Sequence, residues 1–434
     1  METDILIVGS GCAGLYCALQ LPADKKIVII TKGIVEHSDS FLAQGGMCML
    51  KDEEDFESYF EDTMRAGHSE NNPEAVEIMI RSSKDTVEDL LSYGVDFQRE
   101  EDGSLSFTRE GGHSDKRILF HKDITGKEIT GKLLSQVQKR SNIRIIEHCA
   151  MVDIITEENT CYGVVVRDKN GEISTISANY TVFACGGIGG LYKYSTNYKH
   201  LTADAIAIAL NHGIELENIN YVQIHPTTLY CENPQERSFL ISESVRGEGA
   251  VLYNANKERF VNELLPRDML TAKIREQMKK DDKPYVWLSM ENIPEEEIKQ
   301  HFPNIMEHCQ KMGYDVLREC IPVVPAQHYF MGGIKVNMSS HTSMKQLYAI
   351  GETACNGVHG RNRLASNSLL ESLVFAKRAA KEMTKNFQRT SKEKQLAAAN
   401  DLAKYQDKEV IEKQYKEIVL KEIERLDKEL CTIQ

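Results

Sequence analysis

Apolar residues near the start of this chain fall into short, uninterrupted runs that end at glycine or polar residues. Residues 5–8 and 27–30 are two such runs, rich in isoleucine and valine. Strands buried on both faces of a parallel sheet have this pattern, whereas half-exposed strands alternate between apolar and polar residues. Residues 15–21, between the two runs, favour a helix. The pattern therefore predicts a β-strand, a helix and a second β-strand in that order.

Helical spacing dominates two longer segments. Residues 56–93 are predicted to be helical, and Pro73 can open a second helix there because proline is favoured in a first helical turn. Residues 367–383 predict another helix, with Ser366 or Asn367 as its N-cap.

Between these helical segments, residues 142–187 have a β-like pattern. Two strand-like runs, 162–167 and 172–177, flank a Lys-Asn-Gly sequence at 169–171, which is a strong hairpin signal. Residues 181–184 predict one more buried strand. We expect a β-meander followed by a returning strand.

The composition changes near residue 218. The following segment carries several prolines, the single tryptophan, Trp287, and a highly charged stretch at 294–300. A further buried strand is predicted at 347–350, so the first domain resumes after an insertion. The predicted fold class is α/β, with a Rossmann-like nucleotide-binding domain at 1–218 and 328–388, an inserted α+β domain at 219–327, and a short helical C-terminal tail at 389–434.

The tail is rich in lysine and glutamate, and its apolar residues lie near helical spacing. These residues are Ile411, Tyr415, Ile418, Ile423, Leu426 and Leu430. Two interpretations stay open: a helix that packs along the body of the protein, and a short helical contact with a second subunit.

A glycine-rich turn at residues 9–14 joins the first predicted strand to the first helix. Strand, glycine turn and helix in this order form the dinucleotide-binding fingerprint. In it Gly9 allows the tight turn, Gly11 lets the backbone approach a pyrophosphate, and Gly14 lets helix and strand pack closely. The phosphates of a bound nucleotide are expected at the free amides of the helix N-terminus.

The second strand departs from the pattern of NAD-binding proteins. Such a strand usually ends in an acidic residue that binds a ribose hydroxyl. Here it ends in Thr31 and Lys32, and the nearest acid is Glu36. This departure argues against NAD as the nucleotide.

Charge and composition narrow the function further. A formal net charge of -13 argues against binding to nucleic acid or to an anionic membrane. No apolar run has the length of a membrane span, and the chain enters a strand at once, so we expect a cytoplasmic protein without a signal peptide. The 11 cysteines include no Cys-x-x-Cys pair, so no metal site is predicted and buried thiols are the simplest interpretation.

Further motifs follow in a fixed order. They are Ala-Gln-Gly-Gly at 43–46, Thr-Arg-Glu-Gly-Gly-His at 108–113, Gln-Ile-His-Pro-Thr at 223–227, Ser-Glu-Ser-Val-Arg-Gly-Glu-Gly at 242–249, Pro-Arg-Asp at 266–268, Pro-Ala-Gln-His-Tyr-Phe-Met-Gly-Gly at 325–333, and Asn-Arg-Leu-Ala-Ser-Asn-Ser-Leu-Leu-Glu at 362–371. With these motifs the chain resembles the L-aspartate oxidases, within the succinate dehydrogenase and fumarate reductase flavoprotein superfamily, up to about residue 383. Most L-aspartate oxidases continue into a longer helical C-terminal domain.

The resemblance implies FAD as the cofactor, held mainly by residues of the first domain. The family contacts carried over to this chain are Gly9, Ser10, Gly11, Ala13 and Gly14 at the pyrophosphate, Thr31 and Lys32 at the adenosine, Gln44, Gly45 and Gly46 at the isoalloxazine, and Asp204, Glu352, Ser368 and Leu369 around the rest of the pocket.

Two further features bear on the flavin. Succinate dehydrogenases attach FAD covalently to a histidine, and Asp39 stands at that position here, so non-covalent FAD is expected. The helix that starts at Asn367 would place its positive end near the flavin and stabilise the reduced, anionic form.

The resemblance also assigns the groups that bind a dicarboxylate. Arg363 can hold a carboxylate bidentately. His225, His328 and Ser242 are the other family ligands. We further expect the inserted domain to cap the site, with hinges near Asn218 and Gln327.

Proton transfer is assigned to Arg267 by the same resemblance. Because the pKa of arginine lies above about 12, it could release a proton only transiently, through a relay to Glu243 or Glu248 that Arg246 completes. A structural salt bridge between Arg267 and Asp268 is the alternative.

Glu110 distinguishes between possible substrates. A carboxylate at this position can pair with the α-ammonium of aspartate, and dehydrogenases of unsubstituted dicarboxylates have no acid there. The alternative is a simple loop charge. The implied reaction is hydride transfer from L-aspartate to flavin, giving iminoaspartate, as the first step of NAD biosynthesis.

Several points stay open at this stage. Either O2 or fumarate could reoxidise the flavin, quinolinate synthase is a possible partner, and a monomer and a homodimer are both possible. The rival interpretations are a soluble fumarate reductase or succinate dehydrogenase flavoprotein and a non-catalytic flavin-binding protein.

Overall fold

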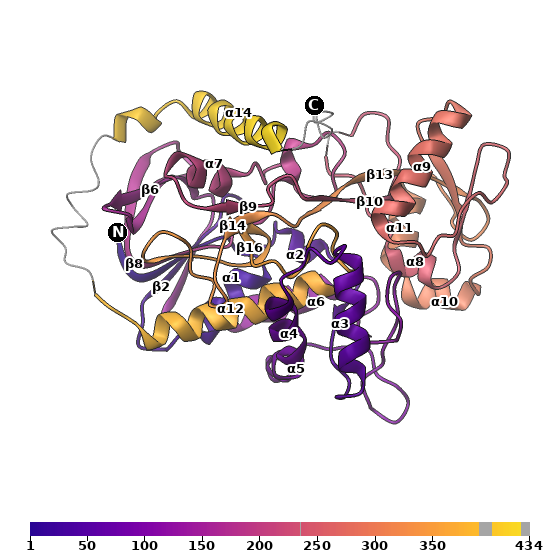
Figure 1. Ribbon diagram of the computed structural model, residues 1–434, viewed down its shortest axis with the longest axis horizontal. Coiled ribbons are helices and arrows are strands. Elements are labelled where there is room, and N and C mark those ends of the chain that lie inside the picture. The colour runs from indigo at the N-terminus through magenta and orange to yellow at the C-terminus, as the bar shows by residue number, and fades with distance from the viewer. Residues whose placement is uncertain (235, 390–401, 427–434) are drawn as a thin grey trace.

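The computed structural model describes residues 1–234, 236–389 and 402–426. Its main body is built on a seven-stranded sheet in the order β5-β2-β1-β8-β7-β6, with β15 pairing with β8 (Figure 1). The strands are β1 Glu2–Val8, β2 Ile27–Ile30, β5 Ile143–Ile146, β6 Ala150–Glu157, β7 Thr160–Arg167, β8 Ile173–Phe183 and β15 Leu347–Ala349. β1 pairs in parallel with β2 and β8, so the predicted strand, helix and strand unit is confirmed.

Residues of β1 point alternately to the two faces of this sheet. Ile5 and Ile7 belong to one buried cluster, and Leu6 and Val8 belong to another. Burying a large aliphatic side chain stabilises a fold by about 1.5–3 kcal/mol, so an uninterrupted apolar run is favoured only where both faces are covered.

Strand β8 differs from the prediction. Two separate strands were expected, at 172–177 and 181–184, but β8 runs without a break over Ile173–Phe183. Its first half pairs antiparallel with β7 across the predicted hairpin, and its second half pairs in parallel with β1 and β15. No proline or glycine interrupts the segment between the two halves, so one strand serves both neighbours.

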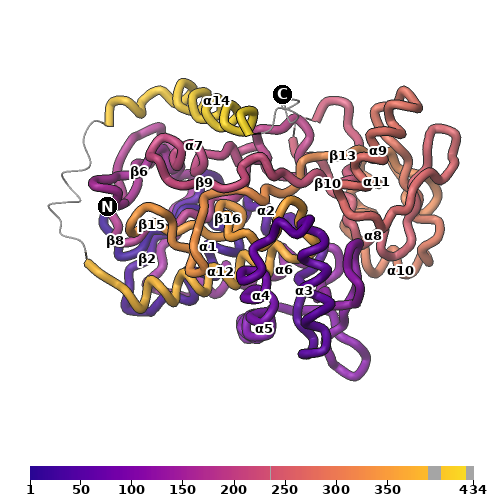
Figure 2. The backbone as a smooth tube through the Cα atoms, viewed as in Figure 1, coloured from indigo at the N-terminus to yellow at the C-terminus, as the bar shows by residue number. Residues whose placement is uncertain are grey.

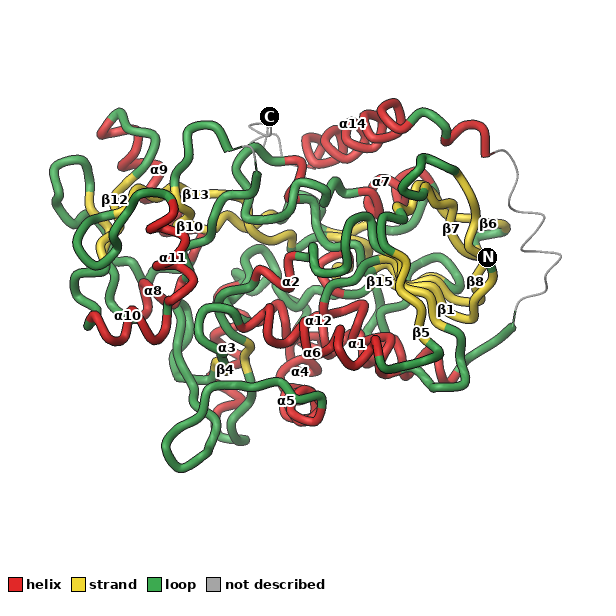
Figure 3. The backbone as a smooth tube through the Cα atoms, turned by 180° about the vertical axis from the view of Figure 1, so that it is seen from behind, coloured by secondary structure: helices red, strands yellow, loops and turns green. Residues whose placement is uncertain are grey.

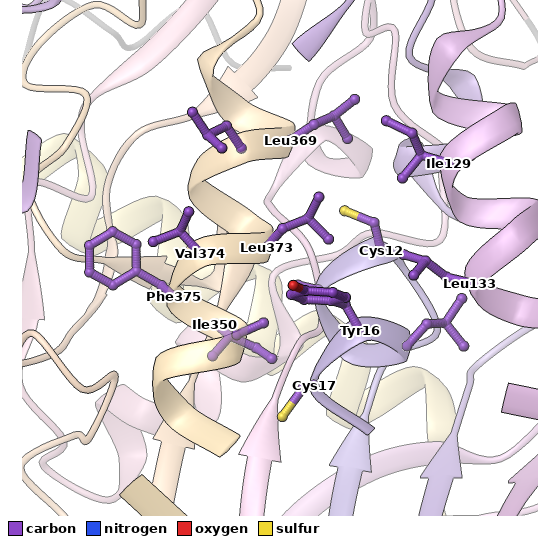
Figure 4. Packing of buried hydrophobic residues seen from close by; sticks show 14 of the residues in the cluster. Cys12, Tyr16, Cys17, Ile129, Leu133, Ile350, Leu369, Leu373, Val374 and Phe375 are labelled. Atoms are coloured by element: carbon purple, nitrogen blue, oxygen red, sulfur yellow. The ribbon is translucent and has the colours of Figure 1, made fainter. Parts of the chain in front are cut away.

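One face of the sheet is covered by α1, α6 and α12. Figure 4 shows Tyr16 of α1 among Leu133, Leu373 and Ile350, and all four side chains are buried. The predicted helical segment 56–93 forms three helices; Pro73 opens the second of them, as predicted. The helices of the body are α1 Cys12–Gln20, α2 Asp39–Leu42, α3 Asp55–Ala66, α4 Pro73–Arg81, α5 Ser83–Ser92, α6 Thr125–Gln138, α7 Asp204–Asn211, α12 Asn367–Lys385 and α14 Lys408–Leu426.

The other face carries α7 and α14. In α14, Tyr415, Val419 and Ile423 are buried, and the Tyr415 hydroxyl donates to the carbonyl of Val152 at 2.5 Å. The predicted helical tail therefore packs along the body within residues 402–426, whereas Leu426 is exposed, contrary to the spacing argument. Leu430 lies outside the described residues. None of the helices within the described ranges combines the length and apolar character that a membrane span needs.

A second sheet, antiparallel and in the order β10-β13-β12-β11, lies beside the main body (Figure 3). It packs with four helices around its own buried cluster, which includes Leu252, Leu270 and Ile274. Its elements are β10 Val222–Leu229, α8 Glu243–Gly247, β11 Val251–Tyr253, α9 Arg267–Asp281, β12 Val286–Ser289, α10 Glu295–His301, α11 Pro303–Lys311 and β13 Ile321–Phe330. The exact domain boundaries stay a prediction.

Segments far apart in sequence meet within the main body. Figure 2 shows α12, from the last third of the chain, beside the N-terminal α1. The small strands here are β3 Met47–Cys48, β4 Ile118–Leu119, β9 Leu216–Glu217, β14 Gly333–Lys335 and β16 Ala354–Cys355, and three short 3-10 turns lie at Gly189–Leu191, Gly351–Thr353 and Leu402–Tyr405.

Candidate functional site

A cavity of about 220 Å³ runs from the glycine turn after β1 towards the second sheet. We call its two ends the fingerprint end, lined by Gly9, Ser10 and Gly11, and the arginine end, lined by Arg267 and Arg363. Residues from both parts of the fold line it, as the discontinuous motifs require.

Close backbone contacts shape the fingerprint end. A Cβ atom added to Gly9, whose φ is +121°, would lie 1.9 Å from the carbonyl oxygen of Ala184. A Cβ atom on Gly14 would lie 2.3 Å from the carbonyl oxygen of Gly9, so Gly14 is needed where helix α1 meets the turn. The N-cap of α1 is Gly11, and the first turn holds no acidic residue, so its positive end is open to an anion.

Lys32, predicted at the adenosine, contacts Asp204, which was predicted among the residues around the rest of the pocket. The Lys32 ammonium lies 2.5 Å from the Asp204 carboxylate, and the Thr202 hydroxyl donates to the same carboxylate at 2.7 Å. Thr31 and Lys32 line the cavity together with Thr202, which the sequence motifs did not indicate.

The middle of the cavity contains buried acceptors that have no partner among the described residues. These are Oε1 of Gln44 and Oδ2 of Asp39. Burial raises the pKa of Asp39 to about 7 and that of Glu352 to about 8, so at neutral pH Glu352 favours the neutral form and Asp39 is about half ionised. Unpartnered polar atoms, a glycine-lined wall and a helix N-terminus with no acidic residue in its first turn fit a large polar cofactor such as FAD.

The start of α12 differs from the prediction in its chemistry. Ser366 is the N-cap residue, but its φ is +62° and its side chain does not cap the helix. Its hydroxyl instead donates to Oε2 of Glu110 at 2.6 Å and accepts from the amide of Gly46 at 3.2 Å. Ser368 accepts from Arg363 at 2.6 Å, and Leu369 also lines the cavity.

At the arginine end, Gln223 links the two guanidinium groups. Its Oε1 accepts from Nη1 of Arg267 at 2.8 Å and from Nε of Arg363 at 3.3 Å. The guanidinium of Arg363 also lies 4.4 Å from the ring centre of Tyr329. Burial lowers the pKa of Arg363 to about 10, which leaves it charged at neutral pH.

Two histidines face each other at the same end. The rings of His225 and His328 lie 5.1 Å apart at an interplanar angle of 69°. Thr196 hydrogen-bonds Nδ1 of His328 at 2.7 Å, while Nε2 of His225 is buried without a partner in the described part of the chain. Burial, followed by the charge of Arg267, holds the pKa of both rings well below the usual value, so both are neutral.

Arg267 forms an ion pair with Glu243 rather than with Asp268. Its Nε donates to Oε2 of Glu243 at 2.6 Å. Burial alone would raise the pKa of Glu243, but Arg267 and then Arg246 lower it, so Glu243 is ionised. Asp268 pairs with His68.

The other members of the predicted relay differ in position. Nη2 of Arg246 lies 3.7 Å from Glu243, and its Nη1 donates to the carbonyl of Glu263 at 2.6 Å. Glu248 hydrogen-bonds His301 at 2.9 Å, so the relay partner in contact with Arg267 is Glu243.

Glu110 is buried and lines the cavity. Its Oε1 accepts from the hydroxyl of Ser244 at 2.8 Å, and its Oε2 accepts from Ser366. Burial raises its pKa, and the nearby Glu243 adds to this. A Cβ atom on Gly45 would lie 2.8 Å from Oε1, so Glu110 lies directly beside the predicted isoalloxazine loop.

The predicted site residues therefore converge. All of them line the cavity except Gly14, which packs against the glycine turn, and Arg246, which contacts Glu243. Their individual roles stay predictions. Tyr329 and Gln223 were missed although they lie inside recognised motifs, and Thr196, Asn197 and Arg237 also line the cavity but carry no local sequence signal.

Comparison with known proteins agrees with this geometry. Residues 4–369 match the family model described as an FAD binding domain. The chain is 50% identical over 380 residues to an L-aspartate oxidase of Clostridium perfringens, covering 88% of this chain and 86% of that protein. It is 47% identical over 406 residues to an L-aspartate oxidase of Clostridium acetobutylicum, covering 93% of each.

A solved structure is similar as well. The chain superposes on an E. coli quinol fumarate reductase with a TM-score of 0.85 and 30% sequence identity, covering 92% of this chain and 73% of that one. The fold and site are those of an FAD-binding oxidoreductase. Within that class, the chain belongs to the L-aspartate oxidase family. The predicted α/β fold, FAD cofactor and family are confirmed.

Proposed function

We propose that this protein oxidises L-aspartate to iminoaspartate. The observation that supports this most is the arrangement at the arginine end. Two buried guanidinium groups, two neutral histidines and the carboxylate of Glu110 line the same space, and the other carboxylate there, Glu243, is already paired with Arg267. A dicarboxylate needs cations and donors at both ends, and an α-ammonium needs an anion between them. The identity to L-aspartate oxidases supports the same substrate.

Each group at this end has a distinct task in the proposed reaction. FAD, when bound, supplies the acceptor for the two electrons that leave L-aspartate. Arg363 holds one substrate carboxylate through its planar, bidentate guanidinium, and His225, His328 and Ser242 donate to the carboxylates. Neutral histidines can do this without adding charge to a buried site already crowded with arginine.

Arg267 moves the proton. Its Nε–H already points at the ionised Glu243, so this proton can pass to Glu243 along the 2.6 Å hydrogen bond, and the guanidine that remains can take the proton that leaves the substrate. Arg246 adds to the effect of Arg267 in keeping Glu243 ionised and so stabilises this relay. Without these two positive charges, burial would favour a neutral Glu243 that cannot accept the proton.

Glu110 selects the amino acid. An ionised carboxylate beside the flavin loop can pair with the α-ammonium of aspartate, and succinate and fumarate offer no such group. The hydroxyls of Ser244 and Ser366 stabilise the ionised form against the effect of burial.

The wider role follows from the chemistry of the product. We place the protein in the cytoplasm, where it catalyses the first step of NAD biosynthesis. Quinolinate synthase then consumes the iminoaspartate that it forms. O2 or fumarate reoxidises the flavin. Residues 219–327 act as a cap that closes over the substrate, on a monomer or a homodimer.

A steady-state assay tests the substrate. Purified protein should release iminoaspartate from L-aspartate with fumarate or O2 as acceptor and should turn over succinate much more slowly. Faster turnover of succinate than of aspartate would favour a fumarate reductase or succinate dehydrogenase function, for which the E. coli quinol fumarate reductase is the structural precedent.

A further inference from the structure

Glu110 is held from two sides by elements far apart in sequence. Ser366 precedes α12 in the main body, and Ser244 lies in the first turn of α8, which packs with the second sheet. Each serine donates to a different carboxylate oxygen, at 2.6 Å and 2.8 Å. Two donors on two oxygens fix the plane of the carboxylate.

The contact with α8 is a tight one. A Cβ atom on Gly247 would lie 3.1 Å from the carbonyl oxygen of Arg109, and one on Gly111 would lie 2.4 Å from Oε1 of Glu243. A side chain at Gly247 would press α8 against the backbone of the loop that carries Glu110, and one at Gly111 would displace the Glu243 carboxylate. Gly247 therefore lets α8, and with it Ser244, lie close to this loop.

Hydrogen-bond direction along α8 is set by the ionised carboxylate. An ionised Glu110 can only accept, so the single hydroxyl hydrogen of Ser244 is donated to it. Without substrate, the oxygen of Ser244 then accepts from the Ser242 hydroxyl, 3.2 Å away. Once substrate binds, Ser242 donates that hydrogen to the substrate carboxylate instead. One helical turn thus joins Ser242, the proposed hydrogen-bond donor to the substrate, to Glu110, the carboxylate that selects the substrate.

We propose that Ser244 is a positioning residue for Glu110, which orients it towards the substrate α-ammonium and keeps it ionised from the α8 side. This inference rests on the proposed function. Its neighbour Glu243 pairs with Arg267, so consecutive residues of one helical turn serve the selection of aspartate and the transfer of the proton.

Several charged or titratable groups act on Glu110 together with Ser244. Burial and Glu243 raise its pKa, whereas the two serines and Arg267 lower it. Removing the Ser244 hydroxyl therefore raises that pKa further. The other groups that face Glu110 stay in place in such a variant, and they are Glu243, Arg246, Arg267, Arg363 and Cys48.

The test is the pH profile of kcat/KM for L-aspartate in Ser244→Ala and Ser244→Thr holoenzymes. Because Glu110 must be ionised to bind an ammonium, activity rises with pH on the acidic limb. In Ser244→Ala the midpoint of this limb should move up by about one pH unit. At pH values below the midpoint, kcat/KM should then be about 10-fold lower than in the wild type. Ser244→Thr keeps the hydroxyl donor and should restore the wild-type midpoint.

Fumarate reduction by the same preparations separates positioning from general damage. Its rate should stay within about twofold in Ser244→Ala, because fumarate has no ammonium. Ser289→Ala, which removes a hydroxyl from β12 of the same sheet, is the matched control and should change neither rate. An unshifted acidic limb in Ser244→Ala, or an equal loss of both activities, would overturn the inference.

Glu110→Gln distinguishes this inference from the function on which it rests. If Glu110→Gln loses aspartate oxidation selectively while Ser244→Ala behaves as wild type, the function stands and Ser244 has no positioning role. If Glu110→Gln loses both activities equally, the assignment of Glu110 itself is wrong, and the inference falls with it.

Discussion

The two ends of the cavity are built from different chemical groups and from different parts of the chain. The fingerprint end is made of backbone and glycine, supplied by a continuous stretch at residues 9–14 and by neighbours packed against it. The arginine end is made of buried charged side chains drawn from the loop at Glu110, from α8 and α9, and from the approach to α12.

This difference predicts different responses to mutation. At the fingerprint end, shape and free amides matter, so a substitution acts through space and backbone conformation. At the arginine end, each charge is set by its neighbours, so removing one group changes the protonation or orientation of the others. The first end should govern how well FAD is held, and the second should govern which substrate reacts and how fast.

The largest effect is expected from Arg267→Gln, because the relay loses the group that moves the proton. The kcat for L-aspartate should fall about 10³-fold. Bound FAD per chain, measured by flavin absorbance, should stay unchanged, because Arg267 lies at the other end. Loss of bound FAD together with activity would contradict the claim that the arginine end acts on the substrate and not on FAD binding.

Glu110→Gln should lower kcat/KM for L-aspartate about 10- to 100-fold, the range for losing a hydrogen bond to a charged group. Fumarate reduction should be largely spared. Competition between succinate and L-aspartate gives a second measurement, since succinate should inhibit the variant about as well as the wild type.

Gly9→Ala tests the fingerprint end of the cavity. The new Cβ atom would meet the Ala184 carbonyl at 1.9 Å, so strand β8 and the turn must separate and FAD affinity should fall at least about 10-fold. Gly171→Ala is the matched control, because Gly171 also has positive φ, +86°, but has nothing within 4 Å. The FAD dissociation constants of the two variants separate the effect of the clash with Ala184 from the effect of backbone strain. An equal loss of FAD affinity in both variants would show that the clash is not the cause.

The smallest effect concerns Asp39 in the apoprotein. Its folded pKa, about 7, lies above the ordinary value of 3.8, so its contribution to stability is present at low pH and is lost as the pH rises through 7. Asp39→Asn should therefore stabilise the apoprotein at pH 8 by at least about 1 kcal/mol and change little near pH 4. Thermal unfolding at several pH values measures this, and a pH-independent difference would contradict it.

The two ends also differed in how far the sequence predicted them. The turn at 9–14 was predicted because strand, turn and helix follow one another in sequence. Gly14 has a local steric reason, the carbonyl of Gly9, whereas the atom that requires Gly9 belongs to Ala184. The continuity of β8 was missed because pairing with β7 on one half and β1 on the other is a property of the assembled sheet. The exposure of Leu426 likewise depends on where α14 ends on the body.

At the arginine end, motifs gave the residues but not their connections. The serine before α12 was expected to cap the helix, yet Glu110, 256 positions earlier, takes its hydroxyl. Gln223 was missed because its role exists only once Arg267 and Arg363 lie on either side of it. Such three-dimensional hydrogen bonding leaves no periodicity in the sequence.

The central claim is that aspartate reaches a cavity holding FAD and is oxidised there. Anaerobic titration of the purified protein with L-aspartate, followed by flavin absorbance, tests this directly. We expect stoichiometric bleaching by L-aspartate and little change with the same concentrations of succinate. Flavin absorbance that L-aspartate leaves unchanged, in protein that carries bound FAD, would contradict it.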